Sequence, residues 1–156
     1  MLEIDIPGRG AFEIHHVVCD YNGTIAADGR LEEGVASRIQ EIAEYVQVSV
    51  LTADAFGTVR AECTDLPVDV RVFDRDDASA CKAAIVRKLG PQGCVCIGNG
   101  FNDIAMFGEA ALSFGIVGKE GACGRLLACS DVVATNPIDA FDLLIHVDRL
   151  RATLRG

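Results

Sequence analysis

The sequence predicts one α/β domain, residues 1–156, with three layers: a doubly wound parallel sheet between two layers of helices. Three observations lead to this prediction. Short apolar segments alternate with segments of helical spacing, the apolar segments are almost continuously apolar, and no repeat or linker interrupts the chain. Strands that are apolar throughout are typical of parallel sheets buried on both faces, and a chain of this length can bury one core.

The first part of the chain predicts a hairpin, a core strand and a helix. "LEIDIP" and "AFEIHHVVCD" flank the turn sequence "PGRG", so we expect an N-terminal β-hairpin that leads into the first core strand. Leu31, Val35, Ile39 and Ile42 follow helical spacing, which predicts a helix over this segment.

The remainder continues the alternation of strands and helices. We expect strands at "VQVSVLT", "VDVRVF" and "CVCIG" and a short helix over residues 56–63. A further helix is expected over residues 78–89, and Gly90-Pro91 should end it. "FNDIAMFGEA" and "GACGRLLACS" are expected to be helical, and "ALSFGIVG" and "DVVAT" to be strands. Asn136 is expected to cap a final helix that runs to residue 150, with Asp139 completing a capping box.

The charge balance argues against two classes of partner. The chain has 14 basic and 23 acidic residues, a net charge of -9, and no basic cluster. Nucleic acids and anionic membranes reward Lys and Arg, so we expect neither as a partner. No apolar stretch reaches the roughly 18 residues that cross a bilayer, and the acidic start with Pro7 does not resemble a secretory signal. Membrane insertion is therefore not expected.

The cysteines and histidines predict structural roles. Seven cysteines is an odd number, and several lie in apolar segments, which favours reduced, buried thiols and a cytoplasmic location. Cys94 and Cys96 share one face of a strand, but without further ligands at metal spacing we interpret them as core residues rather than a metal or redox pair. His15, His16 and His146 are interpreted as structural or surface residues.

Polar side chains follow several of the predicted strands. Ligands of open α/β sheets bind outside the carboxyl ends of the strands, so these residues are expected to meet at one edge. A lysine joins them from a predicted helix. Nucleophilic, hydroxyl, ammonium and carboxylate groups at one edge are the parts that phosphoryl transfer requires. The residues are Asp20, Thr52, Asp54, Asn99 and Asp103, with Lys82 from the helix.

The order of these motifs resembles a known family. Asp20-x-Asn22-Gly23-Thr24, "LTAD", Lys82 and "GNGFND" resemble the haloacid dehalogenase (HAD) superfamily, which has a Rossmann-like fold. Within it, the chain looks most like the phosphorylation domain of P-type ATPases, in a stand-alone form. That domain carries an Asp-Lys-Thr-Gly-Thr loop, a Thr-Gly-Asp loop, a Lys and a Gly-Asp-Gly-x-Asn-Asp loop. The resemblance covers about residues 17–131.

The resemblance implies a phosphoryl-transfer site. Asp20 would attack phosphorus and form an aspartyl-phosphate, and Lys82 would neutralise charge on both groups. Thr52 and the backbone N–H of Ala53 would hold the phosphoryl oxygens, with Asn102 touching the phosphate or ordering its loop. We expect the Asp20 carboxylate and the Lys82 ammonium to lie close enough to share one ligand, and both to reach solvent.

The resemblance also implies a metal and a shaped loop. Asp20, the backbone carbonyl of Asn22, Asn99 and Asp103 would bind Mg²⁺, which prefers oxygen ligands. Gly23 would let the chain turn beside the phosphate, and Thr24 would pin that turn, while Asp54 supports the second loop.

Two asparagines depart from the family pattern. Asn22 stands where typical HAD phosphatases have a second Asp that protonates the leaving group and activates water, and an amide can do neither. Asn99 stands where the ATPase loop has a metal-binding Asp, so weaker metal binding is expected. We predict slow turnover and a long-lived phosphoenzyme. Both asparagines precede glycine, and one hypothesis is that deamidation on ageing restores Asp at one or both positions and raises activity.

No cap domain or nucleotide-binding insert is expected. Only residues 25–51 and 55–81 separate the first three motifs, and isolated folding units below about 40 residues are rare. ATP-driven ion transport by this chain alone is therefore not expected. The open site would accept a small phosphorylated substrate or a phosphoprotein. The unpaired edge of the N-terminal hairpin is a candidate contact for a homo-oligomer.

Several functions remain open at this point. The first is a Mg²⁺-dependent phosphohydrolase acting through Asp20 on a phosphate ester or an acyl phosphate. The second is a regulatory or phosphate-sensing protein of low turnover, whose missing base comes from a partner. A phospho-acceptor like the receiver domains of response regulators fits less well, because their reactive Asp follows the third strand. A dehalogenase would have no use for the metal ligands.

Overall fold

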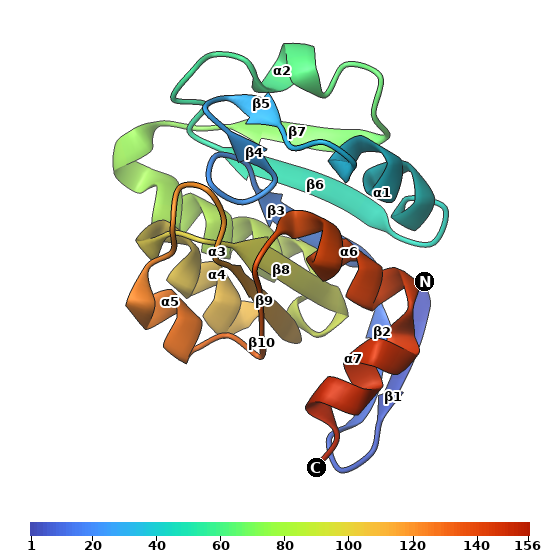
Figure 1. The fold of residues 1–156 in the computed structure, drawn as a ribbon. Coiled ribbons are helices and arrows are strands. Elements are labelled where there is room, and N and C mark those ends of the chain that lie inside the picture. The colour runs from blue at the N-terminus through green and yellow to red at the C-terminus, as the bar shows by residue number, and fades with distance from the viewer.

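A six-stranded parallel sheet forms the centre of the protein (Figure 1). The structure is a computed structural model and describes residues 1–156, apart from the side chain of Arg75. The strand order is β10-β9-β8-β3-β6-β7, and every neighbouring pair is parallel. The predicted α/β class is therefore confirmed. The strands are β3 (His16–Asp20), β6 (Gln47–Thr52), β7 (Val68–Val72), β8 (Cys94–Gly98), β9 (Leu112–Ile116) and β10 (Val132–Ala134).

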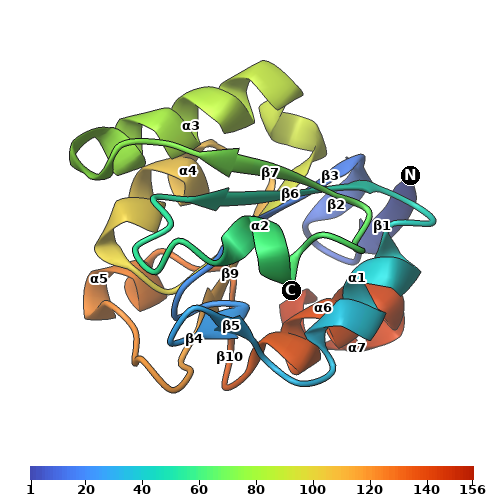
Figure 2. The ribbon, with the colours of Figure 1, turned by 90° about the horizontal axis from the view of Figure 1, so that it is seen from above.

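Helices cover both faces of this sheet (Figure 2). On one face α3 (Ala78–Leu89), α4 (Ile104–Glu109) and α5 (Gly124–Ala128) bury an apolar cluster that includes Val18 and Leu51. On the other face α1 (Val35–Ile42) and α6 (Pro137–Ile145) pack over a larger cluster. Cys19 and Val50, the sequence neighbours of Val18 and Leu51, belong to that larger cluster because side chains alternate along a strand.

The predicted N-terminal hairpin is confirmed. β1 (Leu2–Ile6) and β2 (Gly10–Ile14) pair antiparallel as a separate two-stranded sheet. Ile4, Ile6 and Ile14 are fully buried, and α7 (Val147–Leu154) lies along the hairpin (Figure 1). The apolar face of the hairpin is therefore covered within the chain, and its use as an oligomer contact stays a prediction.

The segment after Asp20 differs from the prediction. The helix expected from Leu31 begins only at Val35, because residues 26–31 form a small hairpin, β4 (Ala26–Ala27) and β5 (Arg30–Leu31). Asp28 and Gly29 make its turn with φ of 51° and 77°, the double left-handed geometry that Asp-Gly favours. Tertiary contacts, not the helical spacing, place the side chain of Leu31 against the core.

Two other helices are shorter than expected. α2 covers only Val59–Glu62, and the final helix is broken at His146, whose φ and ψ are -107° and 70°. The break separates α6 from α7 and lets α7 turn onto the hairpin, where Leu150 is fully buried. Short 3-10 turns precede α3, β8 and α4: η1 (Arg75–Asp77), η2 (Pro91–Gly93) and η3 (Phe101–Asp103).

The Asn136 cap of the final helix is confirmed, but the capping box is not, because the Asp139 side chain bonds the side chain of Asn136 and not its backbone N–H. Asn136 Oδ1 accepts the backbone N–H of Asp139 at 2.8 Å, and Asn136 Nδ2 donates to Asp139 Oδ2 at 2.7 Å. The two side chains thus satisfy each other and one helix-end N–H group. Pro137 occupies the first helical position, as predicted.

No cap domain is present among the residues that the structure describes. Residues 25–51 contain β4, β5 and α1, and residues 55–81 contain α2, β7 and η1. These elements belong to the central sheet, its covering helices or the short hairpin, and no separate folded unit rises from them. None of the described helices has the length and apolar character needed to cross a membrane.

The cysteines are free thiols, as predicted. Cys94 and Cys96 lie in the apolar cluster under α3 and α4, which confirms the core interpretation. Burial raises the pKa of the Cys94 thiol to about 11, and it also raises that of Cys96. A thiol reacts as its thiolate, so burial and a raised pKa together suppress reactivity.

We expect thiol-specific reagents to distinguish these cysteines. At pH 8, Cys129, which is exposed, should be labelled within minutes, while Cys19, Cys94 and Cys96 are labelled only after unfolding. Pulse labelling followed by peptide mass mapping measures this. Rapid labelling of Cys96 in the folded protein would contradict the buried placement.

Candidate active site

Asp20 occupies the predicted place, at the carboxyl end of the first core strand. It is the last residue of β3, between β8 and β6, and it is 8% exposed. Its Oδ1 accepts from Lys82 Nζ at 2.6 Å, and its Oδ2 accepts from Thr24 Oγ1 at 3.0 Å. Both oxygens are held, and one edge of the carboxylate still reaches the surface.

The loop after Asp20 is shaped by its own backbone. The carbonyl of Tyr21 accepts the N–H groups of Thr24, Ile25 and Ala26, and Gly23 adopts a φ of 81°. The Tyr21 side chain is fully buried, and its hydroxyl donates to the carbonyl of Gly29 at 3.0 Å. Tyr21 therefore ties this loop to the β4–β5 hairpin, a role that the sequence analysis missed. The sequence signal for this role was a large aromatic residue directly after Asp20, at the end of an apolar segment.

Lys82 connects two carboxylates. Its ammonium reaches Asp20 Oδ1 and Asp103 Oδ1, each at 2.6 Å, and Asn102 Oδ1 at 3.2 Å. An ammonium has three donors, so all are used. Burial by itself would lower the pKa of Lys82, but the two carboxylates outweigh burial and raise it. The expected closeness to Asp20 is confirmed. The expected exposure is wrong for both groups: Lys82, on the buried face of α3, is 1% exposed, and Asp20 is 8% exposed.

Asp103 is the buried counter-ion of Lys82. It is fully buried, and its Oδ2 accepts the backbone N–H groups of Asn99 at 3.1 Å and Gly100 at 2.9 Å. Burial raises the pKa of Asp103 to about 6, and the Asp20 charge acts in the same direction. Gly98 leaves room for this carboxylate, since a Cβ there would lie 2.6 Å from Asp103 Cγ. Asp103 differs from Asp20 in being completely enclosed, so no edge of its carboxylate reaches the surface of the site.

Asn99 fastens two loops together. Its Oδ1 accepts from Thr24 Oγ1 at 3.1 Å, and its Nδ2 donates to the carbonyl of Gly121 at 3.1 Å. Its backbone carbonyl also accepts from Cys123 at 2.8 Å. The side chain lies so close to Gly23 that a Cβ at residue 23 would be 2.4 Å from Asn99 Nδ2. An aspartate could not donate to Gly121, so the amide has a structural use.

Asn22 has a polar atom without a partner. Its Oδ1 is buried, and among the described residues nothing donates a hydrogen bond to it. Buried polar oxygens are nearly always satisfied, so an exception points to a ligand or a water. An amide oxygen can accept a hydrogen bond from such a group but cannot take its proton at neutral pH.

The structure opposes the deamidation hypothesis. Deamidation requires the next backbone nitrogen to attack the asparagine amide, but Gly23 N donates to the Ala26 carbonyl at 2.7 Å. Gly100 N donates to Asp103 Oδ2 at 2.9 Å. Peptide mass mapping of protein aged at pH 8 should therefore find both Asn22 and Asn99 unchanged. Early appearance of aspartate or isoaspartate at either position would contradict this expectation.

The second loop lies at the end of β6. Thr52 is 3% exposed, and its Oγ1 accepts the backbone N–H of Asp54 at 2.8 Å. Asp54, with a φ of 45°, accepts the N–H groups of Thr58 at 3.0 Å and Val59 at 3.1 Å through Oδ1. Asp54 therefore orders the start of α2 and supports the Thr52 loop rather than facing Asp20.

The oxygen donors of the site fit a hard cation. No group of three His, Cys, Asp or Glu side chains is arranged for a metal among the described residues. Asp20 supplies one partly exposed carboxylate, and the loops at Asn22 and Asn99 add neutral oxygens. The side-chain Oδ1 of Asn22 is buried and receives no hydrogen bond from the described residues. Oxygen donors with little charge fit Mg²⁺ that keeps several waters.

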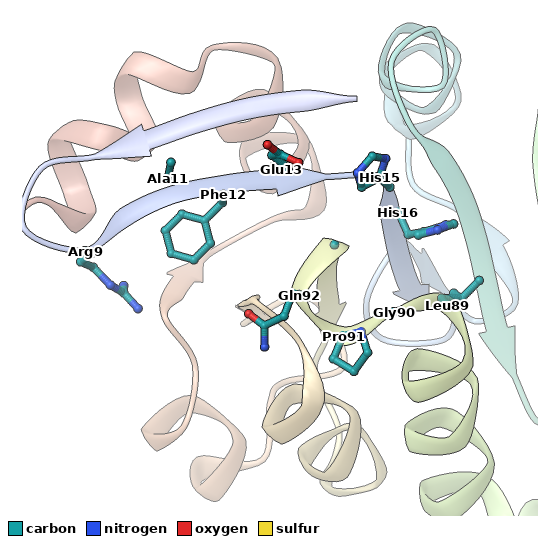
Figure 3. Close-up of a pocket in the computed structure, with 11 residues that line it drawn as sticks. Arg9, Ala11, Phe12, Glu13, His15, His16, Leu89, Gly90, Pro91 and Gln92 are labelled. Carbon is teal, nitrogen blue, oxygen red and sulfur yellow. The ribbon is translucent and has the colours of Figure 1, made fainter.

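A groove of about 720 Å³ lies at the opposite end of the sheet (Figure 3). Arg9, Phe12, His15, His16 and Pro91 are among the residues that line it, and no strand-end residue of the site does. The two imidazoles point away from each other in Figure 3, as their neighbouring positions predict. The groove lacks the carboxylate–ammonium pair found at Asp20 and Lys82. We therefore do not take the groove as the active site, despite its volume.

Comparison with known proteins gives a short sequence match. No family model matches the chain. The uncharacterized protein MJ0073 of Methanocaldococcus jannaschii is 41% identical over 61 residues, which are 39% of this chain and 66% of MJ0073. The match thus spans about two thirds of that relative.

Comparison with solved structures covers nearly the whole chain. The 3-deoxy-D-manno-octulosonate 8-phosphate phosphatase of Moraxella catarrhalis, in complex with magnesium, phosphate and KDO, superposes with a TM-score of 0.70 at 17% identity, over 91% of this chain and 94% of the enzyme. The cobalt-bound form of the Haemophilus influenzae phosphatase superposes with a TM-score of 0.69 at 16% identity, over 91% of this chain and 90% of that enzyme. A putative HAD family hydrolase of Streptomyces avermitilis superposes with a TM-score of 0.64 at 21% identity, over 83% of this chain and 81% of that protein. The chain has the fold of the haloacid dehalogenase superfamily hydrolases.

Proposed function

We propose that this protein is a Mg²⁺-dependent phosphohydrolase that forms an aspartyl-phosphate on Asp20. The observation that carries the proposal is the 2.6 Å contact between Lys82 Nζ and Asp20 Oδ1 at the end of the central strand. A buried ammonium at this distance balances the charge of the carboxylate and offsets the charge that a phosphoryl group would bring. The fold shared with two phosphatases and a HAD family hydrolase supports the same chemistry.

Each residue of the site has a separate role in the proposed phosphoryl transfer. The Asp20 carboxylate attacks phosphorus, a new O–P bond forms, and the bond to the leaving oxygen breaks. Thr52 and the backbone N–H of Ala53 hold phosphoryl oxygens at the neighbouring strand end, and Lys82 stabilises the negative charge. Thr24 orients Asp20 through its hydroxyl, and Asn102 orders its loop through Lys82.

Asp20, the carbonyl of Asn22 and Asn99 Oδ1 would hold Mg²⁺. The cation, when bound, screens the charge of the phosphoryl group and of Asp20. Asp103 acts instead by pairing with Lys82 and by fixing the backbone at Asn99 and Gly100. This division modifies the expected ligand set, in which Asp103 bound the metal directly.

We expect Asn99→Asp to change metal affinity and stability in opposite directions. The added carboxylate should lower the Mg²⁺ concentration for half-maximal phosphorylation several-fold. The lost Nδ2 bond to Gly121 leaves a carbonyl unpaired and should cost about 1–2 kcal/mol of unfolding free energy. Mg²⁺ titrations and urea denaturation measure the two effects. Unchanged Mg²⁺ dependence would remove Asn99 from the metal site.

A second function is favoured by one observation. Asn22 cannot act as an acid or a base, so the same fold could serve as a phosphate-sensing or regulatory protein whose partner donates the base. Such a protein would bind or accept a phosphoryl group at Asp20 and release phosphate quickly only in the complex. Steady turnover without a partner would exclude this alternative.

Covalent trapping tests the proposal. Protein mixed with acetyl phosphate and Mg²⁺, then quenched in acid, should gain the mass of one phosphoryl group, mapped to the peptide that contains Asp20. Chelation of Mg²⁺ should abolish the gain. The proposal fails if no phosphoryl group appears, or if it appears on a different residue.

A further inference from the structure

We infer that the phosphoryl donor is an acyl phosphate, the mixed anhydride of a carboxylic acid, rather than an ester of an alcohol. The inference rests on the proposed function and names the substrate class of the same site. It follows from the absence, among the described residues around Asp20, of a group that can protonate a leaving oxygen.

The leaving group sets the need for a proton. When Asp20 attacks phosphorus, the electron pair of the broken P–O bond passes to the leaving oxygen. An alcohol oxygen would leave as a strongly basic alkoxide, so it must be protonated as it leaves. A carboxylate, with a pKa of about 4, leaves as a stable anion and needs no proton. Of these two donors, only the acyl phosphate suits a site without a general acid.

The groups that touch Asp20 have no proton to give. All three N–H donors of Lys82 are bonded to Asp20, Asn102 and Asp103. The Thr24 hydroxyl lies 3.0 Å from Asp20 Oδ2 and 3.1 Å from Asn99 Oδ1, and its one proton serves these acceptors. Asp103 is fully buried behind Lys82.

More distant acids and bases are engaged or remote. Asp54 Oδ1 accepts two backbone N–H groups at the start of α2 and is engaged there. His15 and His16 lie at the other end of β3, and His146 lies between α6 and α7. Asp74, Asp76 and Asp77 are exposed in the loop before α3 and are not hydrogen-bonded to Asp20 or Lys82.

Asn22 imposes the same limit on the second half of the reaction. Water must attack phosphorus in the aspartyl-phosphate, and a general base would accept the water proton. Asn22 Oδ1 can hold a water by accepting its hydrogen bond but cannot take that proton. Phosphoenzyme formation from an acyl phosphate is therefore fast relative to its hydrolysis, and the phosphoenzyme accumulates.

A comparison of two donors tests the inference. Wild-type protein with Mg²⁺ and acetyl phosphate should release one equivalent of acetate in a burst, reach nearly full phosphorylation by intact mass, and then turn over slowly. With glycerol phosphate it should show no burst, and phosphorylation should be at least about 10²-fold slower. Asn22→Asp should raise glycerol phosphate turnover about 10²–10⁴-fold and remove the acetate burst.

Asn136→Asp is the matched control. It makes the same change of charge at the half-buried cap of α6, after β10 and three strands from β3 in the sheet order. The new carboxylate can still accept the N–H of Asp139 but loses the bond to Asp139 Oδ2, so stability should fall while both donors behave as with wild type. Equal rates of phosphorylation from the two donors in wild type would overturn the inference and leave the proposed function intact. No phosphoenzyme from either donor would overturn both. If Asn22→Asp fails to fold, the wild-type comparison decides.

Discussion

Replacing Lys82 by Met is expected to lower the free energy of unfolding by about 3–5 kcal/mol. The ammonium lies 2.6 Å from a carboxylate oxygen of both Asp20 and Asp103, and its loss leaves two like charges without a counter-ion. Asp103 is fully buried and cannot be solvated. Urea denaturation followed by circular dichroism measures the change.

A surface ion pair provides the control for Lys82→Met. Arg38 Nε lies 2.8 Å from Asp142 Oδ1, but the two side chains are 35% and 17% exposed, so water replaces the lost contact. Arg38→Met should therefore cost no more than about 1 kcal/mol. Equal losses from the two variants would show that the buried pair does not have the stabilising role assigned to it.

The pH dependence of Lys82→Met follows from Asp103. Burial raises the pKa of Asp103 to about 6 in the folded protein, against an ordinary value of 3.8, and Lys82 opposes that rise. Between these values the folded state binds more protons than the unfolded state, so the unfolding free energy falls as pH rises. Without Lys82 the fall should become steeper and extend to higher pH. A loss of stability that is the same at pH 5 and pH 7 would contradict this.

Replacing Asp20 by Asn is expected to abolish the phosphoenzyme and to reduce phosphate release at least about a thousandfold. An amide oxygen is not a nucleophile toward phosphorus, so no other group at this strand end can take over the covalent step. The fold should persist, because an amide oxygen can still accept from Lys82 or Thr24, and Lys82 keeps Asp103 as its counter-ion. Acid-quench mass spectrometry and a phosphate assay measure the two losses.

Asp131→Asn is the matched control for Asp20→Asn. Asp131 precedes β10, where its Oδ1 accepts from Arg9 at 2.7 Å and its Oδ2 from Ser113 N at 2.9 Å. It lies at the amino end of the sheet, away from Asp20, so its replacement should affect stability and not phosphorylation. Retained phosphorylation in Asp20→Asn would place the phosphoryl group on another residue and end the proposal.

The regular elements were predictable because their signals are local. The apolar segments ending at Asp20 and Thr52 have the continuous character of buried strands, and Ala78–Leu89 has helical spacing closed by Gly-Pro. The β4–β5 hairpin was missed although Asp28-Gly29 is a strong turn signal, because its strands have only two residues each. The break at His146 has no local signal. It depends on α7 packing against a hairpin at the other end of the chain.

The sequence by itself determined which chemical groups are available: a nucleophile at Asp20, a cation at Lys82, and an amide where acid–base chemistry needs a carboxyl. Side-chain identity decides those properties, and no packing can make Asn22 a base. Only the tertiary structure decided how the groups are used. In the folded protein Lys82 bonds to both Asp20 and Asp103, and both oxygens of Asp103 accept hydrogen bonds. The Asn99 side chain links its own loop to Gly121. Hydrogen-bond partners depend on the distances between strand ends and helices, and those distances arise only when the sheet is assembled.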